Sequence, residues 1–185
     1  MKIISVIGRP CAGKGTQVRF LQKETVYPAM MTGKMLRQRA EKDDVLGRKI
    51  SEAFEKGVIH PTAVVFSIWT EFFLELKDSS EKGAIIDGSP RKLYEAWMLE
   101  ELFEFLGWKN CWKVFYLEIT EEEAYERMQK RMREYDSEEE VMSRLEWFNT
   151  EVVPVLDYFK EKGMLVTING SNNVEEVWED IKSYL

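Results

Sequence analysis

Short apolar runs alternate along this chain with longer stretches of helical pattern. Four runs rich in β-branched or aromatic residues predict strands, at residues 3–7, 84–87, 113–117 and 165–168. The stretches between them predict helices, among them residues 16–23 and the final 174–185. Strands that alternate with helices in this way indicate an α/β fold, in which a parallel sheet is covered by helices on both faces.

The alternation lapses between residues 31 and 77, where the pattern is helical throughout and predicts a small inserted subdomain. The chain has 185 residues, of which 44% are hydrophobic, and this is enough for one domain with a substantial core. Thr120 and Ser137 stand directly before acidic runs, as N-cap residues do. We therefore expect a single domain, with helices that begin near residues 121 and 138.

Charge and cysteine content argue against several classes of protein. The net charge is −7 and the acidic residues are spread along the chain, so no nucleic-acid partner is expected. The two cysteines, Cys11 and Cys111, cannot form a four-cysteine zinc site, and a reducing, cytoplasmic location is the simplest expectation. No apolar run is long enough to cross a membrane. Since Met1 and Lys2 lead directly into the first strand, we expect no signal peptide either.

The most specific motif lies between the first strand and the first helix, in the run Gly8-Arg9-Pro10-Cys11-Ala12-Gly13-Lys14-Gly15-Thr16. A strand, a glycine-rich loop and a helix form the setting in which backbone N–H groups surround a polyphosphate, and Lys14 would reach its terminal phosphates. The alternative is an ordinary glycine turn, which two glycines with Lys and Thr at this spacing disfavour. The residues expected at the phosphates are Gly8, Pro10, Ala12, Gly13, Lys14, Gly15 and Thr16.

A second motif follows the predicted strand at residues 84–87, which ends in Asp87. An aspartate at the end of a buried strand beside a phosphate loop can hold a water molecule of Mg²⁺. Gly88 and Arg91 come next, and Arg91 would lie near the phosphates. The alternative, a simple strand-to-helix turn with an arginine on the surface, is weaker once the phosphate loop is considered. Because both loops follow strands of a parallel sheet, we expect them to share one cleft.

Both motifs resemble those of the nucleoside monophosphate kinases, and of adenylate kinase above all. The loop has the family's Gly-x-Pro-x-x-Gly-Lys-Gly-Thr form, with Cys11 where the family usually has glycine. A side chain there narrows the loop, or is strained if the position requires a positive φ. Residues 87–91 resemble the family's Asp-Gly-Phe-Pro-Arg signature, with Ser89 in place of Phe. The resemblance implies a three-layer P-loop fold with a five-stranded parallel sheet, and ATP bound with Mg²⁺.

Three further segments resemble the part of the family that binds the monophosphate substrate. Residues 32–37 resemble its Thr-Gly-Asp-x-x-Arg segment, but Lys34 replaces the aspartate and would invert a charge near the metal and phosphates. Residues 57–61 resemble Gly-x-Leu-Val-Pro, with His60 near the base. Since phosphoryl transfer needs positioning more than a base, His60 is expected at the base edge or the surface. The resemblance implies an acceptor site formed by Thr32, Gly33, Arg37, Ile59, His60, Gly88, Arg91 and Glu95.

An arginine-rich stretch extends the resemblance. Residues 133–136 and Arg144-Leu145 resemble the family's Arg-x-Asp-Asp and Arg-Leu elements, whose arginines close over the transferred phosphoryl group. In isolation such arginines would be interpreted as a solvated basic face. The resemblance implies catalytic roles for Lys14, Arg91, Arg127, Arg133 and Arg144. It also places Arg127 and Val174 at the nucleotide, where the backbone of residues 169–170 would lie against adenine.

The resemblance covers the whole chain. It implies a core (1–30, 78–126 and 139–185), an insertion that binds the monophosphate (about 31–77) and a very short lid (about 127–138). The expected protein is a monomer that transfers the γ-phosphoryl group of ATP-Mg to AMP or another nucleoside monophosphate.

Three alternatives stay open. Glu95 stands where the family usually has a glutamine that reads adenine, and a carboxylate only accepts hydrogen bonds, which favours GMP. A nucleotide sensor with weak catalysis is suggested by Cys11, Lys34 and Tyr135, since each changes a position near the chemistry. A P-loop kinase that phosphorylates another metabolite is the third, and the presence of Thr32 and Arg37 argues against it.

Overall fold

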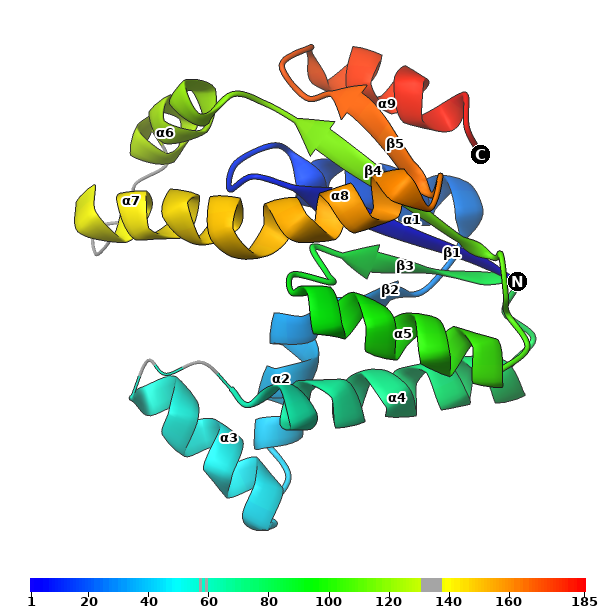
Figure 1. Cartoon of the computed structure of the whole chain (residues 1–185). Helices are drawn as coiled ribbons and strands as arrows, with labels where there is room; N and C mark the ends of the chain where they lie inside the picture. Colours follow the sequence, from blue (N-terminus) through cyan, green and yellow to red (C-terminus); the bar gives the residue numbers. More distant parts are fainter. Residues whose placement is uncertain (57, 59, 131–137) are drawn as a thin grey trace.

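The structure, a computed structural model, describes residues 1–56, 58, 60–130 and 138–185. Its centre is one sheet of five parallel strands in the order β2-β3-β1-β4-β5 (Figure 1). The strands are β1 (Lys2–Gly8), β2 (Ala29–Met30), β3 (Gly83–Asp87), β4 (Trp112–Glu118) and β5 (Leu165–Asn169). The α/β fold and the five-stranded parallel sheet predicted from the sequence are confirmed.

Helices cover both faces of the sheet. They are α1 (Lys14–Thr25), α2 (Thr32–Ala40), α3 (Val45–Glu55), α4 (Thr62–Asp78), α5 (Leu93–Phe105), α6 (Glu121–Lys130), α7 (Glu138–Trp147), the π-helical η1 (Phe148–Val152), α8 (Val153–Glu161) and α9 (Val174–Lys182). The predicted N-cap Thr120 accepts a hydrogen bond from the backbone N–H of Glu123 at 3.1 Å. The other predicted N-cap, Ser137, lies outside the described residues.

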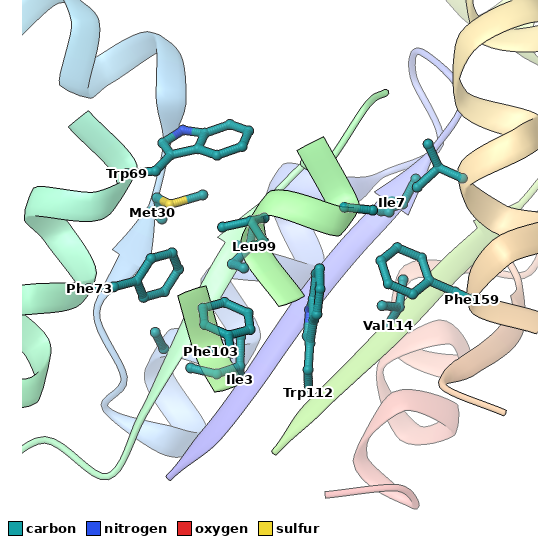
Figure 2. Packing of buried hydrophobic residues seen from close by; sticks show 14 of the residues in the cluster. Ile3, Ile7, Met30, Trp69, Phe73, Leu99, Phe103, Trp112, Val114 and Phe159 are labelled. Carbon is teal, nitrogen blue, oxygen red and sulfur yellow. The ribbon is translucent and has the colours of Figure 1, made fainter. Parts of the chain in front are cut away.

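Alternate residues of each central strand enter two different hydrophobic clusters, as the period of two in a strand requires. In β1, Ile3 and Ile7 pack with α4, α5 and α8, whereas Ile4 and Val6 pack with α1 and α9. Figure 2 shows the first cluster, in which Phe103 and Phe159 pack around Trp112. Burial of each such side chain contributes about 1.5–3 kcal/mol. The two clusters make the sheet a rigid base for the loops at its carboxyl edge.

Strand pairing brings the two predicted site loops together. Val6 of β1 is in register with Asp87 of β3, and the backbone N–H of Gly88 donates to the Val6 carbonyl at 2.9 Å. On the other side, Gly8 pairs with Leu117 of β4. The ends of β1 and β3 therefore lie side by side, at the sheet edge where parallel α/β proteins bind ligands.

Helices α2, α3 and α4 lie between β2 and β3 in the sequence; α4 packs beside α5, and α3 is farthest from the sheet (Figure 1). They have a small hydrophobic cluster of their own, formed by Leu36, Ile50 and Ile68. This part of the chain was expected to bind the monophosphate, and that role stays a prediction. Within the described residues, no helix has both the length and the apolar composition needed to cross a membrane.

Candidate active site

The phosphate loop connects β1 to α1 through two residues with left-handed backbone. Gly13, the N-cap of α1, has φ 91°, and Cys11 has φ 59°. The φ of Cys11 lies in the region that favours glycine, so its conformation is strained by roughly 1 kcal/mol or more. Gly8 is required for a different reason, because a Cβ there would lie 2.8 Å from the Leu117 carbonyl oxygen. The loop is thus packed closely against β4.

Lys14 lies at the centre of this loop. Its Nζ donates to the carbonyl oxygens of Gly8 and Arg9, each at 2.8 Å. The pKa of Lys14 is lowered to about 8, first because burial disfavours the charged ammonium and second because of the Arg91 guanidinium, while Asp87 acts in the opposite direction. A bound polyphosphate would place negative charge beside Lys14 and so favour its charged form.

The loop after β3 faces Lys14. Arg91 donates from Nε to the Gly88 carbonyl at 2.6 Å. A Cβ on Gly88, which has φ 68°, would lie 3.4 Å from Arg91 Nη2 and 3.7 Å from Lys14 Cε, so Gly88 lies between these two cations. The pKa of Asp87 is raised by burial, against the opposing effects of Lys14 and Arg91.

The residues here suit a magnesium ion that arrives with phosphates. Among the described residues, no three Asp, Glu, His or Cys side chains gather into a group that could hold a metal ion. Mg²⁺ bound to a nucleotide, however, needs only one or two carboxylates, because phosphate oxygens and waters supply the other ligands. Asp87, at a strand end facing the loop lysine, fits that requirement.

Two cavities meet at this edge of the sheet. The first, of about 330 Å³, is called the phosphate cavity and is lined by Ile7, Gly8, Pro10, Lys14, Gly88, Arg91, Arg144, Trp147, Phe148 and Val152. The second, of about 500 Å³, is called the insertion cavity and is lined by Thr32, Gly33, Leu36, His60, Thr62, Val65, Trp69, Ser89, Arg91, Lys92, Glu95, Ser143, Arg144 and Trp147. Arg91, Arg144 and Trp147 line both. Two ligands could therefore meet beside two arginines.

Several predicted acceptor residues line the insertion cavity. The Thr32 hydroxyl oxygen accepts a hydrogen bond from Trp69 Nε1 at 3.0 Å and lies 3.4 Å from the Ser89 hydroxyl. His60 Nε2 is 3.2 Å from the Ile50 carbonyl oxygen, and its ring packs edge-on against Phe54. These contacts anchor His60 to α3.

Glu95 is the most unusual residue of the insertion cavity. It is only 8% exposed, and its Oε2 accepts a hydrogen bond from the backbone N–H of Arg91 at 2.8 Å. The carboxylate therefore satisfies an N–H at the start of α5 and also lines the cavity. A carboxylate can accept several hydrogen bonds, so Glu95 can also accept from a ligand in the cavity.

Two residues of α2 are not positioned as the sequence suggested. The guanidinium of Arg37 lies beside Gly33, whose Cβ would be 3.7 Å from both Nη atoms, and the side chain does not line the insertion cavity. Lys34 lines a separate hollow with Gln38 and Glu71. Lys34 thus lines neither of the two cavities, and its effect on the charge near the phosphates stays a prediction.

Arg127 was expected both at the nucleotide and in catalysis. Its two terminal nitrogens each donate to the Gly170 carbonyl at 3.2 Å, and Nη2 also pairs with Glu123 at 3.1 Å. It does not line the phosphate cavity. Arg127 thus contacts the loop after β5, where the resemblance puts adenine, and its catalytic role stays a prediction. It makes this contact because α6 begins at the end of β4 and runs beside that loop.

The same end of the site includes Val174 and a residue that the sequence did not single out. Gln17 is 2% exposed, and its Nε2 donates to the Val174 carbonyl at 3.0 Å. Trp147 and Trp69 were also missed, although Trp147 follows Arg144 by three residues, a spacing that places both on one helix face. Two predicted residues, Ile59 and Arg133, lie outside the described residues.

A phosphate loop, a strand-end aspartate and a second cavity that meets the first at two arginines define a P-loop phosphotransferase. Comparison with known proteins agrees: the family model for adenylate kinase matches residues 6–164. Adenylate kinase 1 of a Nostoc species is 35% identical over 179 residues, covering 97% of this chain and 96% of the relative. Adenylate kinase of Prochlorococcus marinus is 33% identical over 181 residues, covering 98% and 97%.

The chain belongs to the adenylate kinase family, which consists of ATP-dependent nucleoside monophosphate phosphotransferases. Relatives also include longer proteins. Adenylate kinase of Archaeoglobus fulgidus is 30% identical over 210 aligned residues, covering 97% of this chain and 95% of the relative. Since this chain has 185 residues, that relative contains segments without a counterpart here.

Proposed function

We propose that this protein transfers the γ-phosphoryl group of ATP, bound with Mg²⁺, to a nucleoside monophosphate held in the insertion cavity. The observation that carries the proposal is the meeting of the two cavities at Arg91 and Arg144. A donor phosphate beside Lys14 and an acceptor phosphate beside Thr32 would approach each other there. AMP is the acceptor that the family leads us to expect.

The residues would act by positioning and by charge. The N–H groups of the loop and Lys14 would hold the β- and γ-phosphates, and Asp87 would hold a water of the Mg²⁺, which supplies further charge neutralisation. Arg91 and Arg144 would stabilise the negative charge spread over the transferred phosphoryl oxygens. No catalytic base is required, since the transition state is largely dissociative. Arg37 would need to turn from Gly33 to reach the acceptor phosphate, and Arg127 would serve the adenosine end.

A coupled assay tests this proposal. Purified protein is incubated with ATP, Mg²⁺ and each common nucleoside monophosphate in turn, and formation of ADP is followed. We expect turnover at roughly 1–100 per second with at least one monophosphate. ATP binding without turnover on any of them would favour the alternative of a nucleotide sensor, whereas turnover on an acceptor without a phosphate would favour a metabolite kinase.

The buried Glu95 supports GMP as a second candidate acceptor. Guanine presents two adjacent donors, N1–H and the 2-amino group, whereas adenine N1 carries a lone pair that would face the carboxylate. If Glu95 contacts the base, Glu95→Gln should shift the ratio of kcat/KM for GMP over AMP toward AMP by about 5- to 150-fold, which corresponds to about 1–3 kcal/mol.

The measurement is this ratio in the parent protein and the variant. Glu100→Gln is the matched control, because Glu100 pairs with Lys162 and lines neither of the two cavities. An AMP preference in the parent that Glu95→Gln leaves unchanged would show that Glu95 does not contact the base and serves only the start of α5.

The lowered pKa of Lys14 predicts a pH dependence of ATP binding. In the free protein Lys14 loses its proton as the pH rises through about 8, and bound phosphates raise its pKa again. Binding is therefore accompanied by proton uptake, and the affinity for ATP should fall by up to about tenfold per pH unit above 8. Calorimetric titration between about pH 7.5 and 9.5 measures this, because ATP itself is fully ionised over that range. The affinity of Lys14→Ala should be low and independent of pH, and a constant affinity in the parent would contradict the prediction.

A further inference from the structure

The phosphate loop contains an arginine that the catalytic scheme does not use. Arg9 follows Gly8, and its side chain contacts the helical segment that carries Arg144. Arg9 Nη1 donates to Asn149 Oδ1 at 2.7 Å, and the centre of its guanidinium lies 4.8 Å from the centroid of the Phe148 ring. Glu121, at the start of α6, completes the contacts, 3.8 Å from Arg9 and 2.7 Å from Asn149 Nδ2. Arg9 thus joins the loop to two helices.

Arg9 and Phe148 are shielded from solvent, whereas Asn149 is exposed and the side chain of Glu121 is 43% exposed. The Arg9 side chain is 15% exposed, and its Nε is buried without a hydrogen-bond partner among the described residues. Phe148 is 3% exposed and stacks on Tyr116 of β4, with ring centroids 6.5 Å apart and planes inclined by 20°. The Arg9 guanidinium therefore packs between a buried ring and two more exposed polar partners. The buried part of the link between loop and helix is the packing of Arg9 on Phe148.

The backbone of Arg9 contacts Lys14, the other cation to which we assign a catalytic role. Its carbonyl oxygen accepts a hydrogen bond from Lys14 Nζ at 2.8 Å and another from the Ala12 N–H at 3.2 Å. The same residue therefore contacts Lys14 through its carbonyl and the Arg144 helix through its side chain.

Arg144 lies one helical turn before Phe148, so the two side chains share a face of the segment formed by α7 and η1. Both line the phosphate cavity. The segment changes to a π-helix at Phe148, directly where Arg9 contacts it, and π-helical turns are frequent at functional sites. A displacement of Phe148 and Asn149 would be transmitted along the helix to Arg144.

We propose that Arg9 is a positioning residue, which fixes the Arg144 helix relative to Lys14 so that Lys14 and Arg144 contact the same phosphoryl group. The proposal rests on the phosphoryl role proposed above for Arg144. Arg9 carries a charge of its own, but that charge is paired with Glu121 and does not line the phosphate cavity. Its contribution is therefore the placement of Arg144.

A double-mutant cycle tests this. Arg9→Ala, Arg144→Ala and the double variant are compared with the parent by steady-state kinetics in ATP and the preferred monophosphate. We expect Arg9→Ala to lower kcat by about 10- to 100-fold, the range that a displacement near 1 Å produces, with KM for ATP changed by no more than about threefold. In the Arg144→Ala background, Arg9→Ala should lower kcat by less than about twofold, because there is no guanidinium left to position.

A second variant approaches the link from the helix side. Asn149→Ala leaves the residues of the phosphate loop unchanged, and we expect it to lower kcat as Arg9→Ala does. In the Arg144→Ala background it should lower kcat by less than about twofold. Lys109→Ala is the matched control, since it removes a cation and an ion pair with Glu104, and Lys109 lines neither cavity.

The outcomes distinguish a failure of the role proposed for Arg144 from a failure of the positioning by Arg9. If Arg144→Ala is fully active, both the role of Arg144 and the positioning by Arg9 are wrong. If Arg144→Ala is impaired and the Arg9 and Arg144 losses multiply, Arg144 keeps its role but Arg9 acts independently of it, which overturns the proposal. Unchanged kcat in both Arg9→Ala and Asn149→Ala overturns it as well. A general loss of structure would lower the Tm of Arg9→Ala and of Asn149→Ala, so a thermal melt of each variant distinguishes it from positioning.

Discussion

Replacing Lys14 by alanine should lower kcat by at least about 10²–10³-fold, the loss typical of removing one preorganised charged donor from a transition state. Lys14 lies at the centre of the phosphate loop, and its Nζ is oriented by the carbonyls of Gly8 and Arg9. A compact ammonium in this position compensates charge on the β- and γ-phosphates as the phosphoryl group leaves. Steady-state kinetics of the parent and the variant measure the effect.

The fold of this variant should stay intact, and the pKa of Lys14 gives the reason. Folding lowers this pKa from about 10.5 to about 8, so the free protein at neutral pH bears a cost of roughly 3 kcal/mol for keeping the lysine charged. That cost is fully present below pH 8 and disappears as the pH rises toward 10.5. We therefore expect the Tm of Lys14→Ala at pH 7 to be no lower than that of the parent, with the difference shrinking at higher pH.

Lys109→Ala serves as the control, because Lys109 is an exposed lysine in an ion pair with Glu104. It should keep both kcat and Tm close to those of the parent. Near-normal turnover by folded Lys14→Ala would show that the loop does not do the chemistry proposed for it.

Local patterns were sufficient for the sheet and the phosphate loop. The nearly continuous apolar run of β1 supplies both faces of the sheet, and the glycines, Lys14 and Thr16 lie within nine consecutive residues of the loop. The strand β2 could not be predicted from the pattern, because two residues are too few to show any alternation. The strain expected at Cys11 is present as a φ of 59°, since a positive φ is set by the loop itself.

Interactions between distant segments could not be predicted in the same way. Arg127 contacts Gly170 because helix α6 and the loop after β5 meet only in the folded sheet. Glu95 was expected at the base, and it also accepts from the Arg91 N–H, because the start of α5 leaves that donor without a helical partner. Charge and motif identify such residues, whereas packing decides what they contact.

The contacts of Arg9 also could not be predicted from the sequence. An arginine in a glycine-rich phosphate loop is visible in the sequence, and its charge suggests a phosphate contact. Its partners, Asn149 and Glu121, are more than a hundred residues away in the sequence, so only the fold shows that the side chain contacts helices. An unusual charged residue in a loop of otherwise small residues is the signal that could have identified it.

Arg144→Ala should lower kcat by about 10²–10³-fold while changing KM for ATP much less. The reason is the position of Arg144 where the phosphate cavity meets the insertion cavity, so its charge matters most when negative charge spreads over the phosphoryl group in transit. Arg144→Lys should recover little of the loss, because a compact ammonium on a flexible stem lacks the planar fork that holds two oxygens at once.

Arg48→Ala is the matched control for this arginine. Arg48 is exposed on α3, where it pairs with Asp43, and it lines neither cavity. Its loss should leave kcat within about twofold, because exposed ion pairs contribute about 1 kcal/mol or less. Steady-state and single-turnover kinetics on all three variants separate chemistry from binding. If Arg144→Ala raised KM and left kcat unchanged, Arg144 would bind the ground state and the transition state equally. Of the described residues to which we assign stabilisation of the phosphoryl group, Lys14 and Arg91 would then remain.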